Sequence, residues 1–160
     1  MRELTINRSA LRNELELLVQ TETLLTAVYD RLLPYVRQED WQLTIRQFKE
    51  ETQRHLGTTL RLLGKRRTNA GRANGALPIQ LLQGGYEDPV GELRGLQELM
   101  AHTFLGQGIW LALRAAASAA GDQNLETVAD GVLREKNGQV VWYESTVREV
   151  GLWAMTRRLP

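Results

Sequence analysis

Cysteine is absent from the 160 residues of this chain, which excludes disulfide bonds, thiolate metal sites and cysteine nucleophiles. An excess of one charge is absent too, because 20 basic and 19 acidic side chains leave a net charge of +1. This balance gives no electrostatic reason to expect nucleic acid or a membrane surface as the partner. No apolar run approaches the roughly 20 residues of a membrane-spanning helix, and the first residues lack the apolar core of a signal peptide. We therefore expect a cytoplasmic protein, with residues 1–160 forming a single domain.

Strand signals are missing as well, whereas helical periodicity runs through most of the chain. Apolar residues recur at alternating steps of three and four, which is the pattern of an amphipathic helix. The fold class predicted from this pattern is all-α. It comprises four helices, at about residues 9–37, 41–63, 89–120 and 123–158.

Polar residues, proline and glycine mark the expected helix ends. Ser9 and Asp40 are suitable N-caps for the first two helices. Asp88 precedes Pro89, a pair typical of a helix start, and Gly121 suits the end of the third helix. The short links predict two antiparallel helical hairpins.

Residues 64–88 contain five glycines and little periodicity. A connection of this length is uncommon in a compact domain unless it crosses over or carries a function. The expected architecture is therefore an antiparallel four-helix bundle made of two hairpins joined by a long crossover.

Polar side chains interrupt the apolar seams of the helices near their middles. Glu22 lies in the first seam, Glu51 and His55 in the second, and Glu135 in the fourth, whereas the third seam contains only the neutral Gln107. Residues four apart share one face of a helix, so Glu51 and His55 point the same way. Their distances from the turns predict one polar layer across the core.

Two kinds of chemistry explain such a layer. Carboxylate oxygen and imidazole nitrogen bind iron and manganese, and di-metal bundle sites use glutamates and Glu-x-x-His pairs on facing helices. The same side chains can instead form a buried hydrogen-bonded network that helps to fix the helix register. The residues leave both interpretations open.

Several short stretches carry a resemblance to a known family; they are residues 20–25, 33–34, 50–55, 61–64 and 121–135. Together they resemble the ferritin-like superfamily, and more closely its small bacterial stress-associated ferritin-like domains. The resemblance covers most of residues 11–145. It implies a four-helix bundle with a possible iron or manganese site, for which Glu22, Glu51, His55 and Glu135 are the matching ligand positions.

The chain departs from the family pattern at several ligand positions. Glu51 and His55 are four residues apart rather than three. The acids expected on the third helix fall near Thr103 and Gly106, and the second ligand of the fourth helix falls near Gly138. These departures favour one metal ion or none over a full di-metal centre. The alternative function is a non-catalytic structural or protein-interaction bundle that has lost metal chemistry.

Three other features receive simpler interpretations. The basic stretch at residues 65–67 favours a solvated loop over a nucleic-acid site at this net charge. His102 lies off the polar layer and is interpreted as a packed or surface histidine. Residues 145–159 extend an apolar stripe beyond the bundle, so we expect this segment to pack on a second subunit of a homo-oligomer or to fold back over the bundle end.

Overall fold

The computed structural model describes residues 5–64 and 88–156, and almost all of this part of the chain is helical. It contains no strand, so the all-α prediction is confirmed there. The predicted crossover lies outside the described residues except for its two end positions. The elements are α1 (Arg8–Leu32), the short 3-10 turn η1 (Leu33–Tyr35), α2 (Glu39–Leu63), α3 (Pro89–Ala120) and α4 (Gln123–Thr156).

The first helix differs from its predicted bounds at both ends. Asn7, not Ser9, caps it, because the Asn7 side chain accepts hydrogen bonds from the backbone amides of Ser9 and Ala10. The helix ends at Leu32, and Pro34 lies in the 3-10 turn that follows. Proline lacks a backbone amide and clashes with the preceding turn, which explains why the helix does not reach residue 37.

The other boundaries follow the sequence more closely. α2 begins at Glu39, two residues before the predicted start, and its N-cap residue makes no side-chain hydrogen bond. α3 has the predicted bounds, since Asp88 accepts a hydrogen bond of 2.6 Å from the Gly91 amide and Gly121 adopts a left-handed conformation with φ of 70°. α4 begins as predicted, and its predicted end at residue 158 lies outside the described residues.

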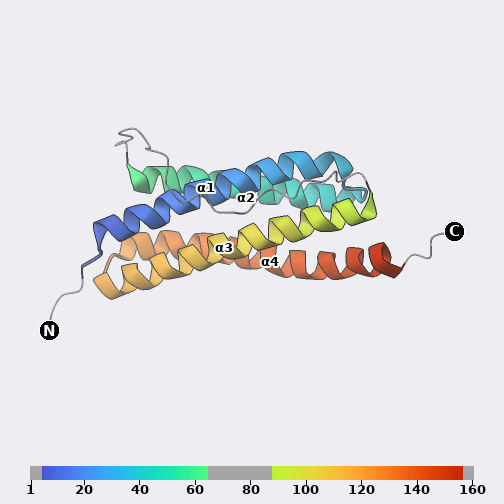
Figure 1. Cartoon of the computed structure of the whole chain (residues 1–160). Coiled ribbons are helices and arrows are strands. Elements are labelled where there is room, and N and C mark those ends of the chain that lie inside the picture. The colour runs from blue at the N-terminus through green and yellow to red at the C-terminus, as the bar shows by residue number, and fades with distance from the viewer. Residues whose placement is uncertain (1–4, 65–87, 157–160) are drawn as a thin grey trace.

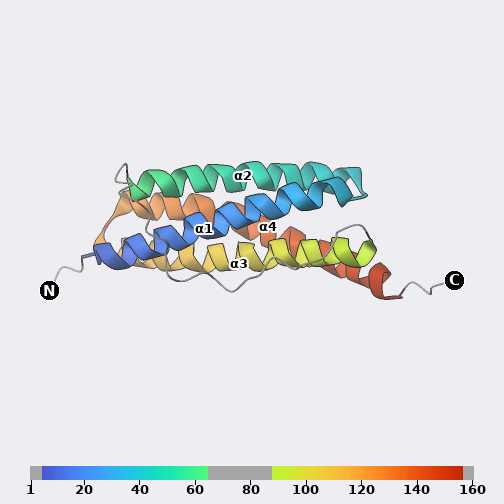
Figure 2. The same cartoon turned by 45° about the horizontal axis from the view of Figure 1, so that its top comes forward.

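The four helices lie side by side in an elongated bundle (Figure 1). α1 packs on α2 and on α3, and α3 packs extensively on α4, whereas α2 and α4 come close at only a few positions. In the turned view, α1 crosses in front of α4, between α2 and α3 (Figure 2). None of the described helices combines the length and apolar character needed to cross a membrane.

Two apolar clusters fill the two halves of the bundle. The first surrounds Tyr29, Phe48, Leu96 and Tyr143, and the second surrounds Leu18 and Trp110. Burial of these side chains supplies most of the folding free energy, at about 25 cal/mol for each Å² of apolar surface. Ionisable side chains between the clusters must therefore be paired or hydrogen-bonded to be tolerated.

Candidate functional site

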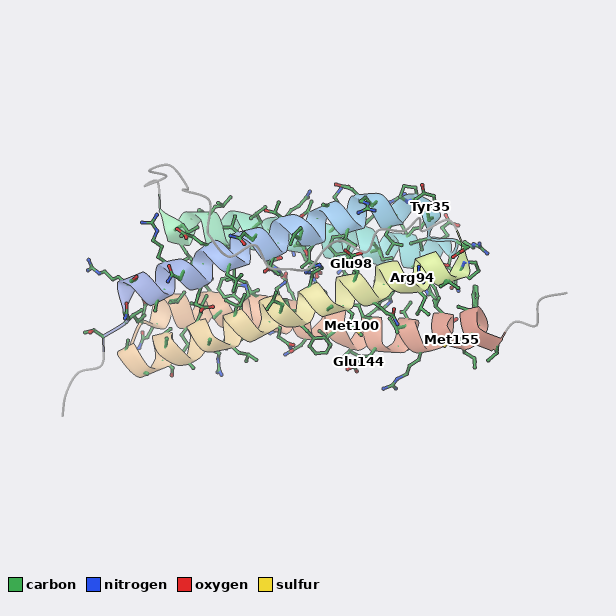
Figure 3. The ribbon with its side chains drawn as sticks, in the orientation of Figure 1. Tyr35, Arg94, Glu98, Met100, Glu144 and Met155 are labelled. Carbon is green, nitrogen blue, oxygen red and sulfur yellow. The ribbon has the colours of Figure 1, made fainter. Side chains whose placement is uncertain are left out.

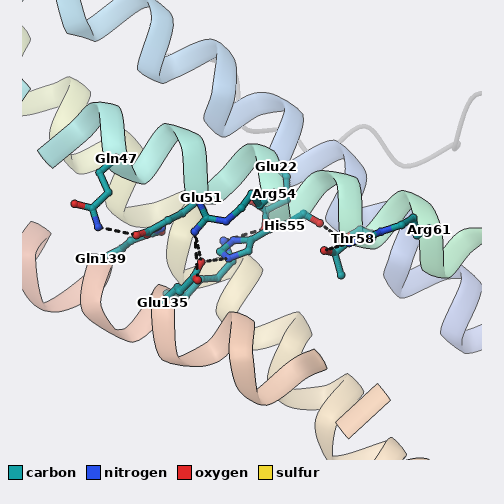
Figure 4. A network of polar contacts seen from close by, with 11 residues as sticks. Glu22, Gln47, Glu51, Arg54, His55, Thr58, Arg61, Glu135 and Gln139 are labelled. Carbon is teal, nitrogen blue, oxygen red and sulfur yellow. Dashed lines mark hydrogen bonds and ion pairs between the residues drawn. The ribbon is translucent and has the colours of Figure 1, made fainter. Parts of the chain in front are cut away.

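A set of polar side chains from three helices lies in the interior of the bundle and at one partly exposed edge. We refer to it as the polar layer, and Figure 4 shows much of it. The sequence predicted the members that come from α1 and α2, but not every member that comes from α4. The polar layer consists of Glu22, Glu51, His55, Glu135, Lys136 and Gln139.

A buried ion pair occupies the interior of the polar layer. The Lys136 Nζ atom lies 2.9 Å from Glu22 Oε1, and both side chains are fully buried. Gly106 on α3 makes room for it, because a Cβ atom there would lie 3.3 Å from both Cε and Nζ of Lys136. Burial raises the pKa of Glu22, and the nearby Lys136 charge opposes that rise. Lys136 therefore supplies the positive charge beside the most buried carboxylate.

The second buried carboxylate is held by amide groups rather than by a cation. Glu51 Oε1 accepts a hydrogen bond of 3.0 Å from Gln47 Nε2, and Glu51 Oε2 accepts one of 2.8 Å from Gln139 Nε2. Gln139 is fully buried. Both oxygens of Glu51 thus have donors from within the protein, as a buried carboxylate requires.

His55 joins α2 to α4 through a carboxylate. Its Nε2 atom lies 2.8 Å from Glu135 Oε2, and the Arg54 guanidinium lies 3.3 Å from the same oxygen. Burial lowers the pKa of His55 to about 4, and the charge of Lys136 adds to this effect. The imidazole is therefore neutral at pH 7. Because a carboxylate only accepts hydrogen bonds, Nε2 carries the hydrogen and Nδ1 is an acceptor.

Two tyrosines extend the polar contacts into the first apolar cluster. The hydroxyl groups of Tyr29 and Tyr143 lie 2.7 Å apart, and both side chains are fully buried. Burial raises the pKa of both phenols, so both stay protonated at neutral pH. This pair can donate and accept hydrogen bonds but supplies no anionic ligand.

The residues present fit a metal centre poorly. Within residues 5–64 and 88–156, no three histidine, aspartate or glutamate side chains gather closely enough to hold a metal ion. Glu22 Oε1, both oxygens of Glu51 and His55 Nε2 already have partners within the protein, so few of the ligand atoms are left for an ion. A divalent cation beside Glu22 would also be repelled by the Lys136 ammonium group.

The expected site residues divide into interior and edge positions. Glu22, Glu51 and His55 are buried as predicted, whereas the Glu135 side chain is 39% exposed at the edge of α4. The α4 side chain that lies in the interior is that of Lys136, which follows Glu135 in the sequence. Sequence reasoning missed it because a lysine is expected to face water.

The third helix contributes space rather than a ligand. Gln107, expected in the polar layer, is only half-buried and donates a hydrogen bond to Asn137. Gly106 faces the interior in its place. Thr103 is buried, but its hydroxyl donates to the Leu99 carbonyl oxygen at 2.8 Å. His102 is buried off the polar layer, as a packed histidine would be.

Comparison of the chain with protein-family models, with curated proteins and with solved structures finds no match.

Proposed function

We propose that this chain is a metal-independent helical bundle that acts by binding other molecules rather than by metal catalysis. The observation that carries the proposal is the 2.9 Å ion pair between Lys136 and Glu22 in the interior. An ammonium group at that position neutralises the buried carboxylate without a metal ion. A buried carboxylate left without such a partner is strongly destabilising, by about 3–5 kcal/mol.

The proposal includes a ferritin-like connection of the helices, with two antiparallel hairpins joined across residues 64–88. The packing of α1 on α2, of α3 on α4 and of α1 on α3 supports this connection. The short links within each pair support it too. On this view the chain shares the bundle of the ferritin-like domains and uses a lysine where they use metal.

A second candidate function is binding of one iron or manganese ion, with the stress-related role that the resemblance implies. It is favoured by one observation, the convergence of His55 Nε2 and Glu135 Oε2 to 2.8 Å at the partly exposed edge of the polar layer. An ion there would have to displace Arg54 from Glu135, since the guanidinium lies 3.3 Å from both carboxylate oxygens.

Elemental analysis of protein purified without a chelator separates the two candidates. The metal-independent bundle predicts iron, manganese and zinc far below one atom per chain. It also predicts a melting temperature that does not change when any of these ions is added. Stoichiometric metal that is lost in both Glu51→Ala and His55→Ala would contradict the proposal and support the second candidate.

A further inference from the structure

The α2–α4 side of the bundle changes character along its length. At one end, large aromatic side chains fill the space between the two helices: Phe48 packs edge-on against Trp142 and Tyr143, with ring centroids 5.5 and 5.6 Å apart. Trp41 packs against Trp142 in the same manner. These side chains close that half of the α2–α4 side.

Among the described residues, the other half of this side has no such filling. A groove of about 650 Å³ runs between α2 and α4, on the far side of the His55–Glu135 contact from the aromatic residues. Gly57 on α2 and Gly131 on α4 both line it, and a Cβ atom built on either would meet nothing within 4 Å. The volume lies within the range of about 300–1,000 Å³ that is usual for small-molecule sites. We refer to it as the α2–α4 groove.

The charges along the α2–α4 groove favour an anion. Arg54 and Arg61 both line the groove, whereas Glu135 is its only acidic lining residue within residues 5–64 and 88–156. Arg54 is already paired with Glu135 at 3.3 Å. The Arg61 guanidinium donates to the neutral Thr58 hydroxyl at 3.0 Å, and no carboxylate of the described residues forms an ion pair with it. In the part of the chain that the structure describes, Arg61 therefore adds a positive charge without a carboxylate partner, and a guanidinium group is suited to bind carboxylate or phosphate.

The rest of the lining suits an uncharged body. Val128 and Val132 on α4 provide apolar surface, and Thr127 lies beside them. His55 closes the inner end of the groove, and its buried Nδ1 atom has no hydrogen-bond partner among the described residues. An unpaired buried acceptor is costly, and a donor group on a bound molecule would satisfy it.

We propose that the α2–α4 groove is a binding site for a small organic anion. The carboxylate or phosphate of the ligand pairs with Arg61, and its apolar body lies over Gly57 and Gly131 against Val128 and Val132. These features fit a ligand that has one acidic group and a short apolar chain. This inference deepens the proposed function and rests on its binding role.

The test is a protein-observed NMR titration with octanoate as the probe and inorganic phosphate as the comparison. Octanoate is expected to shift the amide signals of Gly57, Thr58 and Gly131 in a saturable manner, with a Kd on the order of 1 mM for a ligand of this size. Inorganic phosphate is expected to bind at least about tenfold more weakly, because it has no apolar body.

Two variants locate the site, and each has a matched control. Gly131→Leu fills the groove and is expected to weaken octanoate binding at least about tenfold, whereas Gly108→Leu on the exposed side of α3 leaves it unchanged. Arg61→Gln is expected to weaken it about fivefold, whereas Arg46→Gln, at an exposed position of α2, has no effect. Gly57→Leu provides a second filling variant on the opposite wall if Gly131→Leu fails to fold.

Three results would overturn the inference. The first is the absence of saturable shifts at about 10 mM octanoate, about ten times the expected Kd. The second is equal binding of inorganic phosphate, which would indicate an adventitious ion only. The third is unchanged octanoate affinity in a folded groove-filling variant. The metal content measured for the proposed function bears on none of these, so the two proposals fail separately.

Discussion

His55 is a buried histidine whose charge state is set by its surroundings. Burial and the Lys136 ammonium group lower its pKa, whereas the carboxylates of Glu135 and Glu51 oppose that change. Arg54 also faces Glu135, at 3.3 Å. The balance keeps the imidazole neutral, so that it links α2 to α4 as a hydrogen-bond donor. A neutral link of this kind depends on pH.

The pH dependence of stability follows from the lowered pKa of His55. The unfolded chain takes up a proton near pH 6.5, whereas the folded chain does so only near pH 4. The contribution of His55 to stability is therefore complete above pH 6.5, is lost as the pH falls towards 4, and levels off below that, with a total loss of about 3 kcal/mol. Urea unfolding between pH 7 and pH 4 measures it. His55→Gln keeps a donor for Glu135 but cannot titrate, so its curve is expected to be flatter than that of the wild type by this amount. Parallel curves would show that His55 does not titrate in this way.

At the scale of single elements, sequence periodicity located two of the four helix faces. The seams of α1 and α2 are buried largely as predicted, including Glu22, Glu51 and His55, because each helix has one apolar face. α3 is apolar on most sides, so its pattern selects no single face, and Gly106 lies in the interior where Gln107 was expected. On α4, the stripe through Leu125, Ala129, Val132, Lys136 and Tyr143 was visible in the sequence. The predicted seam of this helix ran through Glu135 instead.

The two glycines at positions 106 and 108 of α3 give a matched test of the buried lysine. Alanine favours a helix over glycine by about 0.5–1 kcal/mol, so Gly108→Ala, at an open position, is expected to stabilise the protein by about that amount. Gly106→Ala places its Cβ 3.3 Å from Cε and Nζ of Lys136, which cannot move away without leaving Glu22. We expect it to destabilise by about 1 kcal/mol, as measured by chemical denaturation. An equal gain in both variants would mean that Lys136 lies elsewhere.

At the scale of the whole molecule, the end of α4 is only partly covered. Val147, Val150 and Ala154 pack on the first apolar cluster of their own bundle. Leu152 and Met155 remain 67% and 77% exposed, and Met155 lies near the last turn of α4 (Figure 3). The sequence predicted an apolar surplus here but not how much of it the same chain would cover. The exposed part is the surface available for a second copy.

We predict a homo-oligomer that depends on this end of α4. Light scattering coupled to size-exclusion chromatography is expected to give at least a dimer for the wild type. The double variant Leu152→Lys, Met155→Lys is expected to give a monomer, because two lysines would have to be desolvated in the interface. Leu43→Lys, at another exposed leucine on α2, serves as the control and should leave the assembly intact. A monomeric wild type would show that these side chains have no partner copy.

The charges of the polar layer matter for the whole molecule, because in the proposed function they make folding independent of a metal ion. Glu22 was recognisable in the sequence as an interior acid, but its partner was not. The resemblance directed attention to Glu135, and Lys136 is the residue after it. The structure pairs Glu22 with Lys136 at 2.9 Å. We therefore propose that the Lys136 ammonium group neutralises Glu22, as a metal cation would.

The unfolding free energy of the wild type and of Lys136→Glu, each measured with and without Mn²⁺, tests this account most directly. We expect Mn²⁺ to leave the wild type unchanged. Lys136→Glu sets two buried carboxylates beside each other, so it is expected to be destabilised by about 3–5 kcal/mol and to regain at least about 2 kcal/mol with Mn²⁺ in excess. Stabilisation of the wild type by Mn²⁺, with no gain in the variant, would contradict the account.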